Sequence, residues 1–190
     1  MSGFFAMLSR MKYINRWGLM NNTRYENIAE HSLEVAMLAH ALVTIANERF
    51  GQELSADRAA VLGIYHDASE IITGDMPTPV KYYNPSIKTA YKAVEAVAQD
   101  KLLSMLPKDL QRVYDDVLHE RDAALMPYVK AADKLSALIK CIEEVRMGNN
   151  EFNLAKSSCE QALLGMDLPA LSVFMDEYLP SYYLTLDELG

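Results

Sequence analysis

Tyr65-His66-Asp67-Ala68-Ser69-Glu70 is the stretch from which the fold and the site can be worked out. An adjacent His-Asp pair follows an apolar run, residues 59–64, that Ser55 can cap as the start of a helix. Successive residues on a helix point about 100° apart, so both side chains can bind one ion only where the helix ends or bends. Gly74 and the two prolines that follow it predict such an ending.

The His-Asp pair suits a divalent transition ion, because it sets an imidazole nitrogen beside a carboxylate oxygen. The alternative is a helix-end histidine paired with a nearby acid, since adjacent His and Asp arise by chance in many chains. Glu70 stands four positions after His66 and three after Asp67. If the turn continues, Glu70 projects over the same patch; otherwise it is an exposed glutamate.

Apolar residues recur at helical spacing along the rest of the chain. The expected helices span residues 4–14, 27–50, 55–66, 85–106, 107–119 and 125–147, followed by two or more short helices. The sequence has no period-two run of strand length, no internal repeat and no low-complexity linker. We therefore predict an all-α protein and, at this length, a single domain over residues 1–190.

Further potential ligands lie on predicted helices far from the His-Asp pair. Asn27 and Glu30 have the form of a capping box, which places His31 in the first turns of a helix. Asp133 lies within the apolar series of a later helix. It is either a solvated acid or an inward carboxylate that needs a cation. His40 is expected to be a packed core histidine.

The only tryptophan, Trp17, follows Arg16 where the first helix is expected to end. It is either a core or interface anchor, or part of a nucleotide grip in which the indole faces a sugar or base and the guanidinium holds a phosphate. The segment 73–79 is expected to be extended or turn-like, because each proline restricts its own φ and the residue before it. A stiff loop of this kind suits a substrate-binding wall.

The net charge of −8 opposes binding to a nucleic-acid polymer, which requires clustered Lys and Arg. A small anion is compatible with it, because one divalent ion and one or two arginines reverse the sign of a local pocket. No uninterrupted apolar run approaches the ~20 residues that cross a bilayer, and no leader pattern is present. The chain is expected to be cytoplasmic, without a membrane partner. Cys141 and Cys159 are expected to be reduced, buried thiols.

The order His31, His66-Asp67, Asp133 provides two imidazoles and two carboxylates, a complete set for one mixed N/O divalent site. This H…HD…D order resembles the HD-domain metal-dependent phosphohydrolase superfamily. Other shared motifs are Leu8-Ser9-Arg10, Ile14-Asn15-Arg16-Trp17, Glu30-His31-Ser32-Leu33, Thr73-Gly74-Asp75, Pro77-Thr78-Pro79-Val80-Lys81-Tyr82 and Gly148-Asn149-Asn150-Glu151-Phe152. With these motifs, the chain resembles the bacterial 5′-deoxynucleotidase branch of that superfamily.

The resemblance implies an HD-domain helical bundle that hydrolyses deoxyribonucleoside 5′-monophosphates to deoxynucleoside and phosphate, selectively against ribonucleotides. It also implies a homodimer and one divalent metal ion, with cobalt preferred and manganese or copper as substitutes. The ion would be held by His31, His66, Asp67 and Asp133.

The same resemblance assigns roles around the ion. Glu70 would serve the attacking water, Arg16 would orient the phosphate and Trp17 would crowd the 2′ side of the sugar. The full set of substrate contacts would be Arg16, Trp17, His31, Asp67, Asp75, Met76, Pro77, Thr78 and Asp133.

Two rival functions stay open from the residues. Another HD phosphohydrolase reaction, on a dNTP, an alarmone or a cyclic dinucleotide, would need a wider basic mouth than Arg16, Arg24 and Lys81 provide. A non-catalytic nucleotide-binding module would be expected to lose Glu70 or a metal ligand, whereas the chain keeps all of them.

Overall fold

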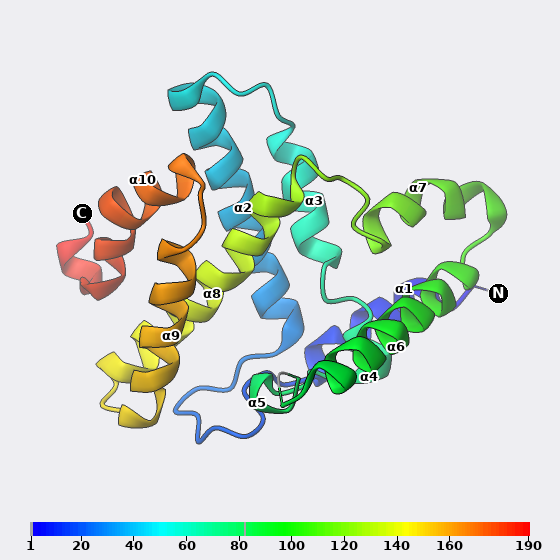
Figure 1. Ribbon diagram of the computed structural model, residues 1–190, viewed down its shortest axis with the longest axis horizontal. Coiled ribbons are helices and arrows are strands. Elements are labelled where there is room, and N and C mark those ends of the chain that lie inside the picture. Colours follow the sequence, from blue (N-terminus) through cyan, green and yellow to red (C-terminus); the bar gives the residue numbers. More distant parts are fainter. Residues whose placement is uncertain (1, 82) are drawn as a thin grey trace. The chain divides into compact units, whose positions relative to one another are not determined.

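The computed structural model describes residues 2–81 and 83–190 (Figure 1). Within these residues the chain forms helices joined by turns and contains no strand, apart from one isolated antiparallel bridge between Asn15 and Asn27. The prediction of an all-α protein is therefore confirmed.

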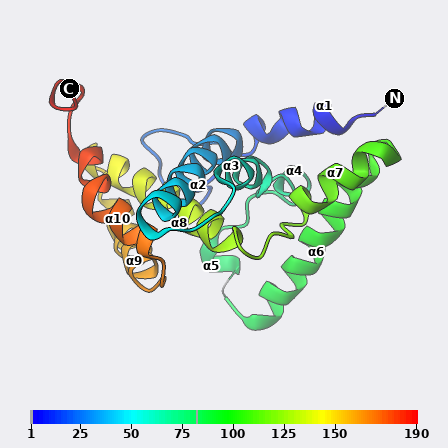
Figure 2. The same ribbon diagram turned by 90° about the horizontal axis from the view of Figure 1, so that it is seen from above.

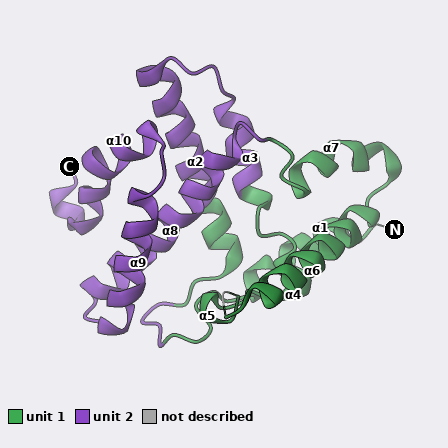
Figure 3. Cartoon of the chain, in the orientation of Figure 1, with its two compact units in different colours: residues 1–20, 25–33, 64–122 green, residues 21–24, 34–63, 123–190 purple. Residues whose placement is uncertain are grey.

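The chain divides into two compact units, each assembled from separate stretches (Figure 3). Unit 1 comprises residues 1–20, 25–33 and 64–122, and unit 2 comprises residues 21–24, 34–63 and 123–190. The assignment of residues 1–190 to one domain stays a prediction.

The elements that lie wholly in unit 1 are α1 (Phe4–Leu8), η1 (Ser9–Tyr13), α4 (Glu70–Thr73), α5 (Thr78–Lys81), α6 (Pro85–Ser104) and α7 (Lys108–Leu118). Two helices have residues in both units, namely α2 (Ile28–Phe50) and α3 (Ala56–Tyr65). Those of unit 2 are α8 (Met126–Arg146), η2 (Asn150–Phe152), α9 (Asn153–Leu164), α10 (Pro169–Glu177), η3 (Leu179–Tyr183) and η4 (Leu186–Glu188).

In unit 1, α6 has contacts with α1, α4, α5 and α7, and Figure 2 shows α7 beside the end of α6. Helix α6 begins as its sequence predicts, because the Asn84 side chain accepts a hydrogen bond from the Ile87 amide and Pro85 occupies the first helical position. The core of the unit is an apolar cluster made of Phe4, Ala68, Leu102, Leu106 and Leu118. In the sequence, Ala68 follows the His-Asp pair and stands two residues before Glu70, so its place in the core fixes the backbone that carries these three residues.

The first helix differs from the single helix expected over residues 4–14. Helix α1 ends at Leu8, and the chain continues as a 3₁₀ helix over Ser9–Tyr13. Ser9 Oγ donates to the Phe5 carbonyl at 3.0 Å, and such back-bonding loosens an α-helix. Tight 3₁₀ turns are common where α-helices end.

The start of α2 is confirmed as a capping box. The amides of Ala29 and Glu30 donate to Asn27 Oδ1 at 3.0 and 3.1 Å, and Glu30 Oε2 accepts from the Asn27 amide at 3.3 Å. The prediction for His40 is wrong, because its side chain is 49% exposed. Apolar residues occupy nearly every face of α2, so periodicity could not decide which face meets solvent.

Helix α2 by itself has the length and the mean hydropathy, 1.3, of a membrane-spanning helix. However, 56% of its apolar window is buried inside the protein, as in the core helix of a soluble protein. The close packing of α2 in unit 2 also indicates a core helix, because a Cβ added to Gly63 of α3 would lie 2.8 Å from Ala36 Cα of α2. The backbones of α2 and α3 thus approach so closely that only glycine fits at position 63.

Helix α8 forms the core of unit 2 and packs against α9, η2 and η3. It carries a buried ion pair between Lys140 and Glu144. Glu144 also accepts hydrogen bonds from the amides of Thr23 and Arg24, at 2.9 and 3.1 Å, and from Asn149 Nδ2 at 2.8 Å. This network attaches residues 21–24 to α8. The two cysteines are buried and free, as predicted.

Candidate active site

His31, His66 and Asp67 come together in unit 1. Nε2 of His31 lies 3.5 Å from Asp67 Oδ2, and Nε2 of His66 lies 3.1 Å from the same oxygen. The two imidazole rings are 5.1 Å apart between centroids, and their ligand atoms lie within 4.8 Å of each other. His31 is fully buried. Two imidazole nitrogens therefore converge on one carboxylate oxygen.

Helix α3 ends at Tyr65, immediately before the His-Asp pair, and residues 66–69 form turns. The amides of Ala68 and Glu70 donate to the carbonyls of Tyr65 and Asp67, which makes two tight turns in succession. Because the helix is already broken there, the adjacent His and Asp can face one point. The expected helix ending near the His-Asp pair is confirmed, but the helix ends before the pair and not after it. A new helix, α4, starts at Glu70.

This donor set fits a divalent transition ion. Imidazole nitrogens suit such ions, and carboxylate oxygens complete mixed N/O sites. Asp133, the remaining ligand expected from the sequence, lies half-buried on α8 in unit 2. Its place in the set stays a prediction.

Glu70 is buried at the first position of α4, with only 8% of its surface exposed. The alternative of an exposed glutamate is therefore wrong. Burial, and then the nearby carboxylates of Asp67 and Asp75, raise the pKa of Glu70 to about 9, against the opposing effect of Arg16 and His66. No residue in the described part of the chain hydrogen-bonds its Oε2 atom. Three acidic side chains gathered in this way favour a bound cation.

Arg16 and Trp17 are joined through a third residue, Glu26. The Oε2 atom of Glu26 accepts from Arg16 Nη1 at 2.7 Å and from Trp17 Nε1 at 3.0 Å. The guanidinium carbon of Arg16 also lies 5.7 Å from the centroid of the Trp17 ring. Glu26 was not predicted from the sequence, because only the pairing of residues 14–17 with residues 26–28 brings it near Arg16.

Asp75 connects this group to Glu70. Burial raises the pKa of Asp75, and Asp67 raises it further, while Arg16 and a hydrogen bond from the Trp17 amide lower it. The site residues predicted on both sides of the His-Asp pair therefore share one electrostatic environment in unit 1.

The loop after α4 turns sharply at Gly74, whose φ of +73° favours glycine. Its carbonyl accepts from Tyr91 Oη at 3.0 Å, which ties the loop to α6. The expected extended segment is shorter than predicted, because α5 already begins at Thr78. Met76 and Pro77 are half-buried and Thr78 is exposed. Lys81 pairs with Glu95 at 3.2 Å, so the basic character of this loop is partly neutralised.

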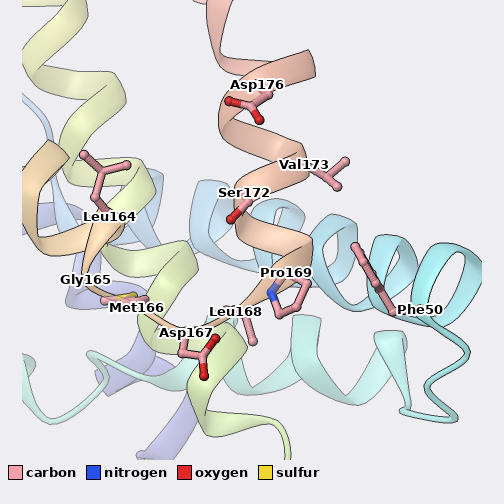
Figure 4. A pocket seen from close by; sticks show the side chains of 10 residues that line it. All are labelled: Phe50, Leu164, Gly165, Met166, Asp167, Leu168, Pro169, Ser172, Val173 and Asp176. Carbon is pink, nitrogen blue, oxygen red and sulfur yellow. The ribbon is translucent and has the colours of Figure 1, made fainter.

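Unit 2 has a hollow whose lining includes none of the predicted site residues (Figure 4). Its volume is about 620 Å³, and its lining comes from Phe50, residues 164–169 and helix α10. None of the imidazoles and arginines of the predicted site belongs to that lining.

Comparisons with known proteins show the family of the chain. A family model described as "5′-deoxynucleotidase YfbR-like" matches residues 3–182. The chain is 50% identical over 191 residues to the 5′-deoxynucleotidase of Klebsiella pneumoniae strain 342, and equally to the 5′-deoxynucleotidase YfbR of Escherichia coli O1:K1. In both cases the match covers 100% of this chain and 96% of the relative.

Solved structures share the fold. An HD-domain phosphohydrolase from Listeria innocua gives a TM-score of 0.82 at 24% identity and covers 94% of this chain and 87% of its own. The HD phosphohydrolase of cyanophage S-2L gives a TM-score of 0.65 at 20% identity, with 93% and 95% coverage. The fold is thus that of the HD phosphohydrolases, and from its full-length match the chain belongs to the YfbR-like 5′-deoxynucleotidase family.

Proposed function

We propose that this member of the 5′-deoxynucleotidase family, a phosphoric monoester hydrolase, uses the site in unit 1 to hydrolyse deoxyribonucleoside 5′-monophosphates. The products are the deoxynucleoside and inorganic phosphate, and ribonucleotides are poor substrates. The observation that carries the proposal is the grouping, in one environment, of a buried glutamate, a His-Asp pair and an arginine beside a tryptophan. The names of the relatives agree with the same reaction.

The metal ligands in this proposal are His31, His66 and Asp67, with Asp133 of α8 as the fourth. A divalent ion held there supplies positive charge against the phosphate and lowers the pKa of water. Two carboxylate ligands balance the formal charge of such an ion. We expect cobalt to be the preferred ion, with manganese or copper as substitutes. The cyanophage S-2L phosphohydrolase was solved bound to dA and one catalytic Zn²⁺ ion, so zinc belongs in the same comparison.

A cation bound nearby would lower the pKa of Glu70, so that its carboxylate can accept a proton from the attacking water or align it. The position of Glu70 at the start of α4, one residue beyond the buried Ala68–Ser69 turn, holds the carboxyl beside the His-Asp pair. A positioned general base contributes ~10² to 10⁴ in rate. Arg16 provides a planar guanidinium, which binds phosphate oxygens in a bidentate manner.

Trp17 crowds the 2′ position of the sugar and so disfavours ribose. Discrimination by bulk against an added hydroxyl is ~10² at most. The loop from Asp75 through Met76 and Pro77 to Thr78 also contacts the sugar in this proposal. His31, Asp67 and Asp133 touch the phosphate as well as holding the ion.

The partner of the site is a small nucleotide, and the net charge of −8 disfavours a nucleic-acid polymer. We place the protein in the cytoplasm as a homodimer. The bacterial relatives and the burial of α2 support a soluble enzyme without a membrane partner.

Phosphate release after chelation and add-back tests this function. The protein is stripped with a chelator, reloaded separately with cobalt, manganese, copper or zinc, and assayed on paired deoxy- and ribonucleoside monophosphates. We expect no activity without metal, recovery with at least one ion, and faster release from the deoxynucleotide. Full activity of the stripped protein would contradict the proposal. Activity on nucleoside triphosphates alone, with pyrophosphate or tripolyphosphate as the product, would contradict it as well.

A further inference from the structure

Glu26 lies outside every set of residues assigned above to metal, substrate or proton transfer, yet it contacts two of those residues. One oxygen, Oε2, accepts from both the Arg16 guanidinium at 2.7 Å and the Trp17 indole at 3.0 Å. The Arg16 and Glu26 side chains are each only 13% exposed. Water therefore competes weakly for this contact, and hydrogen bonds between charged groups are about twice as strong as neutral ones.

The backbone around the three residues is held in the same register. The Arg16 amide donates to the Glu26 carbonyl at 2.9 Å, and the Ile28 amide donates to the Ile14 carbonyl at 2.9 Å. These bonds flank the antiparallel bridge of Asn15 with Asn27. Glu26 thus contacts Arg16 through both its backbone and its side chain, which leaves the side-chain contact little freedom to slip.

Trp17 carries backbone strain at this point. Its φ is +59°, in the left-handed region that residues other than glycine rarely adopt. Such a conformation costs about 1 kcal/mol and persists only where the surroundings enforce it. The Trp17 amide donates to Asp75 and its indole donates to Glu26, so the strained residue is fixed at both ends. The ring direction is therefore set by contacts and not by the backbone preference.

We infer that Glu26 is a positioning residue that couples phosphate orientation to sugar selection, by fixing Arg16 and Trp17 on one carboxylate oxygen. The inference rests on the proposed function, because it takes the phosphate role of Arg16 and the sugar role of Trp17 from there. A guanidinium has five N–H donors, so pairing with Glu26 is compatible with a bidentate grip on phosphate. One carboxylate then fixes the separation between the group that binds the phosphate and the ring that meets the 2′ carbon.

Two substitutions at Glu26 separate its charge from its shape. In Glu26→Ala both contacts are lost, so we expect kcat/KM for the deoxynucleotide to fall roughly 10- to 100-fold. The ratio of kcat/KM between deoxy- and ribonucleotide should fall ~10-fold, because the Trp17 ring can exclude the 2′-hydroxyl only while the ring is held in place. Glu26→Gln keeps an acceptor oxygen for the indole but loses the charge that pairs with Arg16. It should lose activity while keeping most of the selectivity.

The control is Glu177→Gln, which makes the same chemical change in an exposed pair with Arg49 on unit 2. It should change neither quantity. Circular dichroism checks that all variants are folded. If Glu26→Ala does not fold, a folded Glu26→Gln with unchanged kcat/KM for the deoxynucleotide overturns the inference.

Trp17 also provides a readout that needs no turnover, because it is the only tryptophan in the chain. In the free protein, Glu26→Ala should lower the fluorescence anisotropy of Trp17 and shift its emission, and Glu177→Gln should do neither. If wild type releases no phosphate from any deoxynucleotide, the proposed function fails while the fluorescence still tests the contact. If wild type is active and selective, but a folded Glu26→Ala keeps the same selectivity and the same anisotropy, the inference is overturned.

Discussion

Replacing Glu70 by glutamine should make the protein inactive and, once its metal is removed, more stable. Glutamine has nearly the same shape as a protonated glutamate, so it fits the buried position on α4. It cannot accept a proton from water, and we expect kcat to fall ~10² to 10⁴-fold. Glu70 is not among the proposed metal ligands, so the variant should still bind the ion.

The gain in stability follows from the pKa. In the unfolded chain Glu70 ionises around its ordinary value of 4.5, whereas in the folded protein burial and two neighbouring carboxylates raise its pKa to about 9. Between these values the folded state keeps a proton that the unfolded state has lost, so stability falls as the pH rises. The gap between pH 7 and the unfolded-state pKa of 4.5 corresponds to a loss of about 3 kcal/mol in the free energy of unfolding. Glutamine removes this penalty.

The assay is urea unfolding of chelated wild type and Glu70→Gln at several pH values from 5 to 9. The free energies of unfolding should agree near pH 5 and diverge as the pH rises, with the variant more stable. Glu53→Gln, at an exposed glutamate between α2 and α3, is the matched control. A bound cation lowers the pKa of a nearby carboxyl, so metal loading should shrink the difference. Parallel curves for the two chelated proteins would refute the reasoning, as would a fully active variant.

Three further substitutions test the other parts of the site and the core. Trp17→Ala should lower the deoxy-over-ribo ratio of kcat/KM by up to ~10²-fold with kcat on deoxynucleotides largely kept, and steady-state kinetics on paired substrates measures this. Arg16→Lys should raise KM for the nucleotide but leave inhibition by the free deoxynucleoside unchanged, because an ammonium cannot replace a bidentate guanidinium. Glu144→Gln should destabilise unit 2 by roughly 3 kcal/mol in urea unfolding, because Lys140 loses its buried partner. Burial raises the pKa of Glu144, but hydrogen bonds from Lys140 and the residues around it outweigh this and hold the pKa well below its usual range. The stability that Glu144 contributes is therefore present above about pH 4.5 and is lost as the pH falls below that value. The difference in unfolding free energy between wild type and Glu144→Gln should shrink in acid, and a difference that stays constant would contradict this.

Local spacing in the sequence was sufficient for the longer helices and for the identity of the reactive groups, but not for the short helices α4 and α5. Capping at Asn27 and Asn84 depends on residues within three positions, and both helices begin as expected. The His-Asp pair needed a helix break, and the glycine and prolines after it indicated one. The structure puts that break at Tyr65, several residues earlier.

Burial and long-range pairing were decided only by the tertiary structure. An acid four residues after His66 can face either solvent or the protein interior, and the tertiary structure of unit 1 buries Glu70 near two other carboxyl groups, which raises its pKa. The prediction for His40 failed for the same reason, since α2 is apolar on too many faces for its spacing to show which one is exposed. Glu26 meets Arg16 only because two short segments pair across a loop, and a pairing register between distant segments leaves no periodic trace in the sequence. The sequence thus determined which chemical groups are present and in what order, while chain folding decided which of them share one environment, because proximity between distant residues is a property of the packed chain.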